Sequence, residues 1–366
     1  MKRLSIIILV SLVSILGVSS LYAQDNLSGI VYTDASQLTM VGKLMTDTPN
    51  PFHRADTVKY KGFTSSENEQ VRSSSGLALV FKTDSPALYI KADYGYKSYG
   101  TNTMGIALRG FDLYIKKDGK WLWASSACPR LNDENTPFLL LGGMSSEMKE
   151  CLVYLPLYSE LNNLYIGTLE GSAIESVVSP FRHRIGVFGS SYTHGISASR
   201  PGMTYPAQFT RHTGIQLLSL GCSGNCKLQP YFADMLCDAE VDAFLFDSFS
   251  NPTPEEVIER LFPFIEKIQA AHPGIPLIFQ QTIYRERRNF NNDVEKSENA
   301  KQERAEEMMK EACKKYKDVY FIRPCATSKD HETSVDGVHP SDEGYRLWSL
   351  SIEKQVLRIL KRYNLK

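Results

Sequence analysis

Short apolar and β-branched runs, separated by polar turn residues, fill the chain from residue 25 to about residue 180. The runs at 77–81 and 87–92 are two of them, and the Thr-Asp-Ser-Pro stretch between them is typical of a turn. Residues 111–116 alternate between apolar and polar side chains, and the Asp-Gly pair that follows predicts a hairpin. No helical period of useful length occurs here. The pattern predicts an all-β sandwich of the jelly-roll type.

After residue 180 the period of the apolar positions changes, and strand-like runs alternate with helical stretches. Alternation on this scale indicates βαβ units, a parallel sheet and a doubly wound, three-layer α/β domain. A ligand site in such a domain lies outside the carboxyl ends of the strands. The strands are expected at 184–188, 215–220, 241–246, 276–281 and 319–323, and the helices at 205–213, 254–271, 297–316 and 342–363.

Length and terminal composition indicate an exported protein of two domains. The 366 residues suffice for two substantial cores. Lys2 and Arg3 precede an apolar run and a small-residue cleavage site at Ala23, which predicts a signal peptide over 1–23 rather than a membrane span. We therefore expect a soluble periplasmic or secreted product, with a β-sandwich over 24–178 and a second domain over 179–366.

Charge and cysteine usage exclude several kinds of partner. Lys plus Arg and Asp plus Glu both number 41, so the sequence indicates neither a nucleic acid nor an acidic membrane surface as partner. The seven cysteines are an odd number, and Cys222 and Cys226 lack the spacing of a zinc site. We expect partly buried free thiols, and neither a metal nor another cofactor.

The end of the first expected strand in the α/β half carries candidate chemistry. Gly189, Ser190 and Ser191 pass from that strand into a helix, which is a way to expose a serine nucleophile. His339, in the loop before the last helix, is the expected base, and Asp336 would accept the other imidazole N–H. The other histidines are expected to be structural or on the surface, with His194 the one rival base. They are His53, His183, His194, His212, His272 and His331.

Two further strand ends supply hydrogen-bond donors. The second strand ends in a glycine-rich turn that contains Gly224, and the third is followed by Asn251. The backbone N–H groups of Ser191 and Gly224, together with the Asn251 amide, would converge on a developing oxyanion.

These blocks resemble the four motif blocks of the SGNH (GDSL-type) hydrolases, which are serine esterases and lipases with a flavodoxin-like fold. The resemblance covers residues 181–366. In the first half, the stretches 110–114 and 154–158 resemble the β-domain named for its GxDLY motif, and 200–203 resembles a bacterial subgroup of the family. Two departures stand out. Ser190 replaces the usual Asp of Gly-Asp-Ser, and residues 247–252 replace the usual Gly-x-Asn-Asp.

The resemblance implies an exported serine esterase that removes small acyl groups, acetyl first of all, from carbohydrates. Two alternatives stay open: a lipid-ester hydrolase, and a non-catalytic glycan-binding protein that retains the fold. The aromatic residues of the β-domain would form a sugar-stacking platform or, as is commoner, pack as core and cross-strand pairs. They are Tyr94, Tyr96, Tyr99, Trp121 and Trp123.

Overall fold

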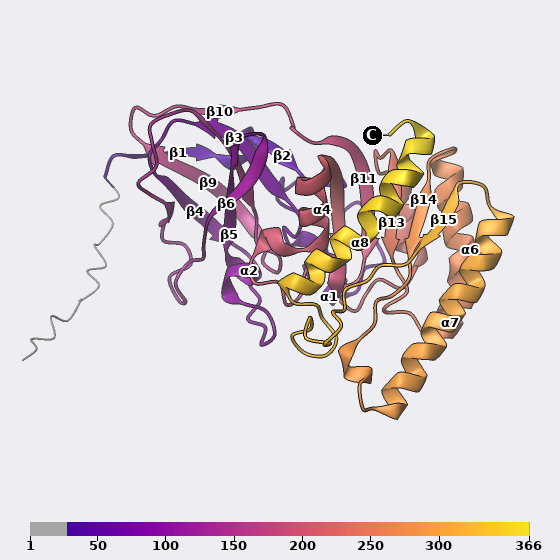
Figure 1. Ribbon diagram of the computed structural model, residues 1–366. Helices are drawn as coiled ribbons and strands as arrows, with labels where there is room; N and C mark the ends of the chain where they lie inside the picture. The colour runs from indigo at the N-terminus through magenta and orange to yellow at the C-terminus, as the bar shows by residue number, and fades with distance from the viewer. Residues whose placement is uncertain (1–27, 366) are drawn as a thin grey trace, which may run out of the picture.

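Two packed units make up residues 28–365, the part of the chain that the computed structural model describes (Figure 1). The predicted signal peptide, residues 1–23, lies outside the described residues. Antiparallel strands form the first unit, and a parallel sheet flanked by helices forms the second. Within the described part of the chain, no helix combines the length and apolar character that crossing a membrane requires.

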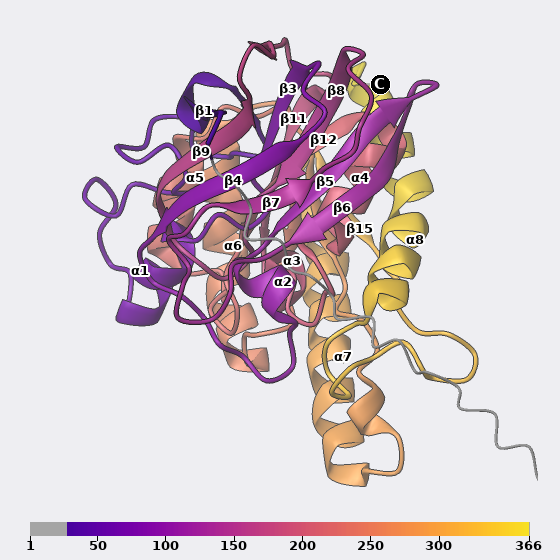
Figure 2. The same cartoon turned by 90° about the vertical axis from the view of Figure 1, so that its left-hand side faces the viewer.

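The first unit is a sandwich of two antiparallel sheets, which Figure 2 shows in front of the second unit. One sheet has four strands in the order β1-β9-β4-β7, and the other has six, in the order β10-β3-β8-β5-β6 with β2 beside β3. Alternate side chains of both sheets, such as Leu79, Phe81 and Ile90, fill the space between them. The strands are β1 (Ile30–Asp34), β2 (Thr39–Val41), β3 (Ala78–Thr83), β4 (Leu88–Tyr94), β5 (Phe111–Lys117), β6 (Lys120–Ala127), β7 (Phe138–Leu141), β8 (Lys149–Tyr154), β9 (Leu161–Leu169) and β10 (Ile174–Ser176).

The second unit is built on one parallel sheet in the order β12-β11-β13-β14-β15. Its strands are near-continuous apolar runs, because helices cover both faces. The strands are β11 (Arg182–Gly189), β12 (Ile215–Gly221), β13 (Ala243–Asp247), β14 (Leu277–Gln280) and β15 (Val319–Ile322). The helices are α3 (Ser191–His194), α4 (Tyr205–Thr213), α5 (Pro230–Cys237), α6 (Pro254–Ala271), α7 (Asn292–Lys315) and α8 (Asp342–Leu360).

Successive side chains of each parallel strand point to opposite faces of the sheet, and each face packs against its own set of helices. Phe188 and Phe246 point into the core formed with α5, α6 and α7. Val187 and Leu245, one position earlier, point into the core formed with α3, α4 and α8. The prediction of an N-terminal β-sandwich followed by a doubly wound, three-layer domain is therefore confirmed.

The first half consists mostly of antiparallel strands, as expected, but it also contains two short helices that its apolar pattern does not indicate. Helices α1 (Ser65–Arg72) and α2 (Gly105–Arg109) interrupt the strand pattern. At the start of α1, the Thr64 side chain accepts the Glu67 N–H, and the Glu67 carboxylate accepts the Thr64 N–H, which makes a capping box. With eight mostly polar residues, α1 shows no apolar period. The Thr-x-x-Glu spacing is the signal that predicts it.

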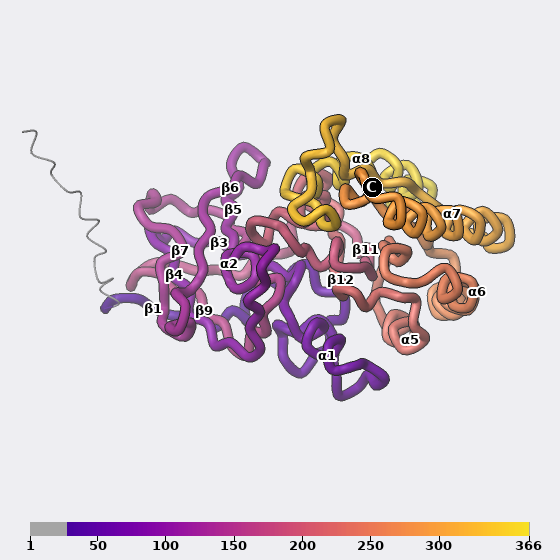
Figure 3. Tube along the Cα trace, turned by 90° about the horizontal axis from the view of Figure 1, so that it is seen from below, coloured from indigo at the N-terminus to yellow at the C-terminus, as the bar shows by residue number. Residues whose placement is uncertain are grey.

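The segment that contains α1 leaves the sandwich and completes the core of the second unit. Figure 3 shows α1 on the same side of the parallel sheet as α5. Leu44, Met45, Ala55 and Val71 are buried in one cluster with Phe232 of α5. The second unit therefore buries apolar surface on residues that precede it by more than a hundred positions, and we expect the two units to fold together.

The five aromatic residues considered for a sugar-stacking platform lie in different surroundings. Tyr94 is buried in the sandwich core, and Trp121 packs on Phe181 at the boundary between the units. The Arg200 guanidinium lies over the Trp123 ring. Tyr96 and Tyr99 are exposed on the loop after β4.

A buried ion pair joins the two sequence motifs at the boundary between the units. The carboxylate of Asp112, on β5, has no exposed side-chain surface and accepts a hydrogen bond from Arg200 at 2.7 Å. It also accepts the Gly202 N–H at 2.9 Å and the Trp123 indole N–H at 3.1 Å. A Cβ at Gly202 would lie 2.7 Å from the same carboxylate, so the close approach requires glycine. The motif at 110–114 thus holds the motif at 200–203.

We expect Arg200→Met to lower the free energy of unfolding by about 3 kcal/mol, because it leaves the Asp112 carboxylate buried without its cation. Denaturant titration measures the effect. The matched control is Arg346→Met, because the pair between Arg346 and Glu343 is exposed and should contribute little. Equal stability of the two variants would contradict a structural role for the buried pair. Adding Asp112→Asn to Arg200→Met should restore part of the loss.

Candidate active site

The turn between β11 and α3 presents Ser191 at the carboxyl edge of the sheet. Ser190 is the N-cap of α3, and its hydroxyl accepts the Tyr192 N–H at 3.2 Å. Ser191 is the first residue of the helix, so its own N–H has no intrahelical acceptor. A Cβ at Gly189 would lie 1.9 Å from Thr193 Oγ1, and glycine is therefore needed for the sharp turn.

Ser191, His339 and Asp336 form a continuous hydrogen-bonded line. Ser191 Oγ lies 3.0 Å from His339 Nε2, and His339 Nδ1 lies 2.8 Å from Asp336 Oδ2. Because an ionised carboxylate can only accept, Nδ1 carries the proton and Nε2 is left to accept the Ser191 hydroxyl. The arrangement can transfer the serine proton to the imidazole, as nucleophilic catalysis requires.

The surroundings lower the pKa of both Asp336 and His339, so both groups favour the deprotonated form. Burial would raise the pKa of Asp336, but hydrogen bonds from the His339 side chain and backbone and from Asn102 lower it. Burial lowers the pKa of His339, and the neighbouring Asp336 opposes that shift only in part. At neutral pH the site therefore holds a carboxylate and a neutral imidazole, the combination that a general base needs.

The structure brings the loops of Gly224 and Asn251 together beside β11. Gly224 has φ +72° in a turn that the Asn225 N–H closes onto the Cys222 carbonyl at 3.0 Å. Asn251 Oδ1 accepts the Cys226 N–H at 3.2 Å, which links the two loops. That bond occupies the oxygen end of the Asn251 amide, and the NH₂ end is the one that remains to donate.

The neighbouring amides are engaged elsewhere. Gln280 donates to the Tyr205 hydroxyl and accepts from the Trp348 indole, and Gln281 donates to the Gln302 carbonyl. Asn251 is therefore a better candidate for an oxyanion donor than either glutamine.

Residues from the first half of the chain hold the loop that carries Gly224. The Arg54 guanidinium donates to the Gly221 carbonyl at 2.9 Å, and the Gln70 amide donates to the Ser223 carbonyl at 3.1 Å. The Tyr158 hydroxyl and Ser223 Oγ lie 2.6 Å apart. The backbone of the candidate oxyanion loop is thus fixed from outside the parallel-sheet unit.

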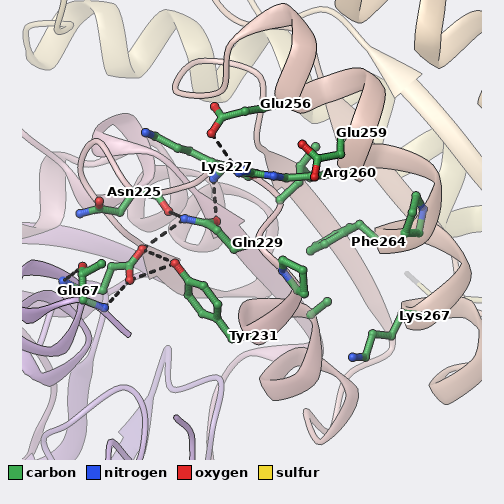
Figure 4. A pocket seen from close by; sticks show the side chains of 15 residues that line it. Glu67, Asn225, Lys227, Gln229, Tyr231, Glu256, Glu259, Arg260, Phe264 and Lys267 are labelled. Atoms are coloured by element: carbon green, nitrogen blue, oxygen red, sulfur yellow. Dashed lines mark hydrogen bonds and ion pairs between the residues drawn. The ribbon is translucent and has the colours of Figure 1, made fainter. Parts of the chain in front are cut away.

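A hollow of about 710 Å³ adjoins this loop at Asn225 (Figure 4). Asn225 forms part of its wall, together with residues of α1, α5 and α6. The buried Glu67 carboxylate of α1 accepts from the Tyr231 hydroxyl at 2.9 Å and from the Gln229 amide at 3.2 Å, as the dashed lines in Figure 4 mark. Helix α1 is thereby fastened to the start of α5.

His194, the rival base, is fully buried and points away from Ser191. Its Nε2 donates to the Leu157 carbonyl at 2.8 Å, and its ring stacks on Tyr158 with centroids 3.9 Å apart. Burial and the nearby Arg54 charge lower its pKa well below the usual range. Its role in this geometry is packing at the boundary between the units.

Asp247, the last residue of β13, is a candidate residue to which the sequence analysis gave no role. Its Oδ2 accepts the Ser190 N–H at 3.1 Å, the Ser190 hydroxyl at 2.8 Å and the Thr193 hydroxyl at 3.0 Å. A carboxylate of the neighbouring strand β13 therefore holds the turn that carries Ser191. Its position directly after an apolar strand is the signal that identifies it. Burial, opposed by these hydrogen bonds, raises the pKa of Asp247 to about 6.

Arg285 supports the nucleophile from the opposite side. Its guanidinium donates to the Tyr192 hydroxyl at 2.8 Å, to the Glu298 carboxylate at 2.7 Å and to the Ser250 carbonyl at 2.8 Å. The Tyr192 ring in turn meets the His339 ring edge-on, with centroids 5.7 Å apart. All of these groups are buried or nearly so, which keeps the candidate nucleophile and base in one geometry.

The cysteines and the potential metal ligands are distributed as follows. The seven cysteines are free thiols, and Cys151, Cys222 and Cys226 are buried. Among residues 28–365, no three His, Cys, Asp or Glu side chains gather as a metal site would require.

Family models match both halves of the chain. The model of the GDSL-like lipase/acylhydrolase family matches residues 182–357. The model of the GxDLY-type N-terminus of SGNH-hydrolase-type esterases matches residues 30–174. The curated proteins that were compared with the chain include no match.

Solved structures show the same two-unit architecture. A Bacteroides ovatus protein described as a GDSL-like lipase is 39% identical, with a TM-score of 0.87 over 91% of this chain and 98% of that one. The salicylyl-acyltransferase SsfX3 of a tetracycline biosynthetic pathway is 20% identical, with a TM-score of 0.69 over 91% and 99%. A family two carbohydrate esterase of Cellvibrio japonicus shares the fold at 11% identity, with a TM-score of 0.60 over 91% and 98%.

The pKa of Asp247 predicts how stability changes with pH. Because its pKa rises from 3.8 to about 6 on folding, its contribution is fully present below pH 3.8 and is lost as the pH rises through 6. The wild type should lose up to about 3 kcal/mol of unfolding free energy between pH 4 and pH 7, because Asp247 ionises there. The side chain of Asp247→Asn cannot ionise, so the stability of this variant relative to the wild type should rise by the same amount over that range. Urea titrations across this range measure the change. A difference between variant and wild type that stays constant with pH would contradict the assignment.

Proposed function

The chain belongs to the GDSL-like lipase/acylhydrolase family, and from that premise we propose that it is an exported serine esterase that removes small acyl groups, acetyl first of all, from carbohydrates. The observation that carries the proposal is the line from Ser191 Oγ through His339 to Asp336, with separations of 3.0 and 2.8 Å. This line has the order that acyl transfer by a serine needs.

In the proposed reaction, Ser191 Oγ attacks the ester carbonyl carbon while His339 Nε2 takes the hydroxyl proton. The carbonyl oxygen becomes an oxyanion that the N–H groups of Ser191 and Gly224 and the Asn251 amide stabilise. His339 then gives the proton to the alcohol oxygen as the C–O bond breaks, which leaves an acyl-serine. A water molecule, deprotonated by His339, attacks that ester and releases the carboxylic acid with Ser191 regenerated. Asp336 keeps the imidazole in the required tautomer throughout.

The carbohydrate part of the proposal rests on analogy of fold and on the predicted export of the chain. The carbohydrate esterase of Cellvibrio japonicus combines similar units over almost its whole length. A lipid ester as substrate, or a glycan bound without turnover, would each give a different outcome in the experiment below.

The test of the proposal is hydrolysis of model esters of increasing acyl length, followed by acetate release from acetylated polysaccharides. We expect acetyl esters to be preferred and Ser191→Ala to lose at least about 10³-fold in kcat. His339→Ala should lose a similar amount, because the two groups act together. The matched control is Ser190→Ala, which removes a helix cap worth about 1 kcal/mol of stability and one hydrogen bond to Asp247 but leaves the nucleophile.

Preference for long acyl chains would favour the lipid-ester alternative instead. Wild type that binds glycan without releasing acetate would favour the non-catalytic alternative. If Ser190→Ala were the inactivating change, the assignment of the nucleophile would be wrong.

Asn251 gives a separate test of the oxyanion site. Asn251→Ala should lower kcat by about 10²-fold, because one preorganised donor is removed. Asn251→Asp keeps an oxygen to accept the Cys226 N–H and loses only the NH₂ donor, so it should lose at least as much. Steady-state kinetics on an acetyl ester measure both. Near wild-type activity in Asn251→Asp would assign the residue to loop structure alone.

A further inference from the structure

A loop of the sandwich unit contacts Asp336, the carboxylate that orients His339 in the second unit. Asn102 lies just before α2, and its Nδ2 donates to Asp336 Oδ2 at 2.7 Å across 234 positions of sequence. Asp336 Oδ2 is the same oxygen that accepts the His339 Nδ1–H at 2.8 Å. The sandwich unit is therefore in direct hydrogen-bond contact with the line of groups that ends at Ser191.

The other end of the Asn102 amide is fixed as well. The Thr103 hydroxyl lies 3.3 Å from Asn102 Oδ1 and donates to it. Thr103 Oγ1 also accepts the Ser197 N–H at 2.8 Å, and Ser197 follows the nucleophile helix α3 by three positions. With its oxygen end engaged by Thr103, the Asn102 amide presents its NH₂ end to Asp336. The loop thus contacts both the acid and the segment after the nucleophile.

Asp336 needs such a partner because its other hydrogen bonds come from its own turn. Asp336 Oδ1 accepts the N–H groups of Val338 at 2.9 Å and His339 at 2.7 Å. The side chain keeps 28% of its surface exposed, so water competes for Oδ2. Asn102 donates to this carboxylate from outside the turn 336–339, whereas the Val338 and His339 donors belong to that turn.

We propose that Asn102 is a positioning residue for Asp336, so that the sandwich unit completes the hydrogen-bonded line on which hydrolysis depends. The proposal rests on the proposed esterase function. Asn102 fixes the rotation of the carboxylate, the carboxylate fixes the imidazole, and the imidazole accepts the serine proton. Asn102 itself touches neither the nucleophile nor the base.

The same loop lines an open hollow of about 670 Å³, together with residues of the second unit that include Ser199 and Asp342. A residue that acts only as a wall for the substrate changes KM. A residue that acts through the acid changes kcat, because substrate binding does not require the oriented carboxylate. The split between kcat and KM therefore separates the two roles.

The first measurement compares Asn102→Ala with a matched control, Asn163→Ala. Asn163 lies on the same unit and donates to an aspartate, Asp93, at 3.2 Å, but that pair belongs to the sandwich strands. We expect Asn102→Ala to lower kcat on an acetyl ester about 10-fold with KM within about 2-fold of wild type, as for loss of a charge-assisted hydrogen bond. Asn163→Ala should match wild type. Asn102→Asp keeps the acceptor for Thr103 but loses the donor, and should lose at least as much as Asn102→Ala.

The second measurement is a double-mutant cycle with Asp336→Ala. If Asn102 acts through Asp336, adding Asn102→Ala to Asp336→Ala should change kcat by less than about 2-fold. A further 10-fold loss in that background would overturn the proposal and assign Asn102 to loop structure. An unchanged kcat in Asn102→Ala, or an effect confined to KM, would overturn it as well.

A readout without substrate distinguishes failure of this proposal from failure of the proposed function. The His339 Nδ1 proton gives a downfield NMR signal when it is held by a carboxylate, and Asn102→Ala should shift it whereas Asn163→Ala should not. A shift in a protein that hydrolyses no ester would refute the esterase and keep the contact. An active wild type with no shift in Asn102→Ala would refute the positioning role alone.

Discussion

The ion pair between Arg200 and Asp112 is the contact on which the rest of this structure depends. It fixes the start of the short 3₁₀ segment Pro201–Met203, which lies a few residues after the nucleophile helix. Between the two, Ser199 donates to Asp342 at the start of α8, directly after the loop of His339. One segment of about ten residues therefore joins the sandwich, the nucleophile and the loop of the base. Because Asp112 is fully buried, it keeps its ion-pair partner at 2.7 Å only while that segment stays in place.

The two units share one site rather than standing side by side. The sandwich unit supplies Asn102 to Asp336 and Tyr158 to the loop of Gly224, and the α1 segment between β2 and β3 supplies Arg54 and Gln70 to the same loop. The turn that carries Ser191 belongs to the parallel-sheet unit, where Gly189 and the Ser190 cap shape it between β11 and α3. The loops that carry Asp336 and Gly224 lie at the surface, and a surface loop holds a fixed geometry only when other elements pack on it. The additional unit gives them that support.

A carboxylate from the neighbouring strand holds the nucleophile turn. Asp247, at the end of β13, accepts hydrogen bonds from the Ser190 N–H and hydroxyl. Its three bonds to Ser190 and Thr193 tie the nucleophile turn to the next strand of the sheet. The Asp247 carboxylate is therefore buried beside the N-terminus of α3, where a negative charge interacts favourably with the helix dipole.

The sequence by itself determined the order of elements and the identity of the residues at the strand ends. The spacing of the apolar positions distinguished the β-sandwich from the doubly wound half. Because parallel strands end at the same edge of a sheet, the loops with Ser191, Gly224 and Asn251 must lie at one edge. Tertiary structure alone decided which side chains support them. Asn102 and Asp336 are separated by 234 positions, and no local pattern marks such a pair. The apolar pattern did not reveal helix α1, because seven of its eight residues are polar and carry no apolar period, and Asp247 acquires its role only through the adjacent strand. Periodicity reports which face of an element is buried, whereas contacts between loops arise from packing that the chain makes only when folded.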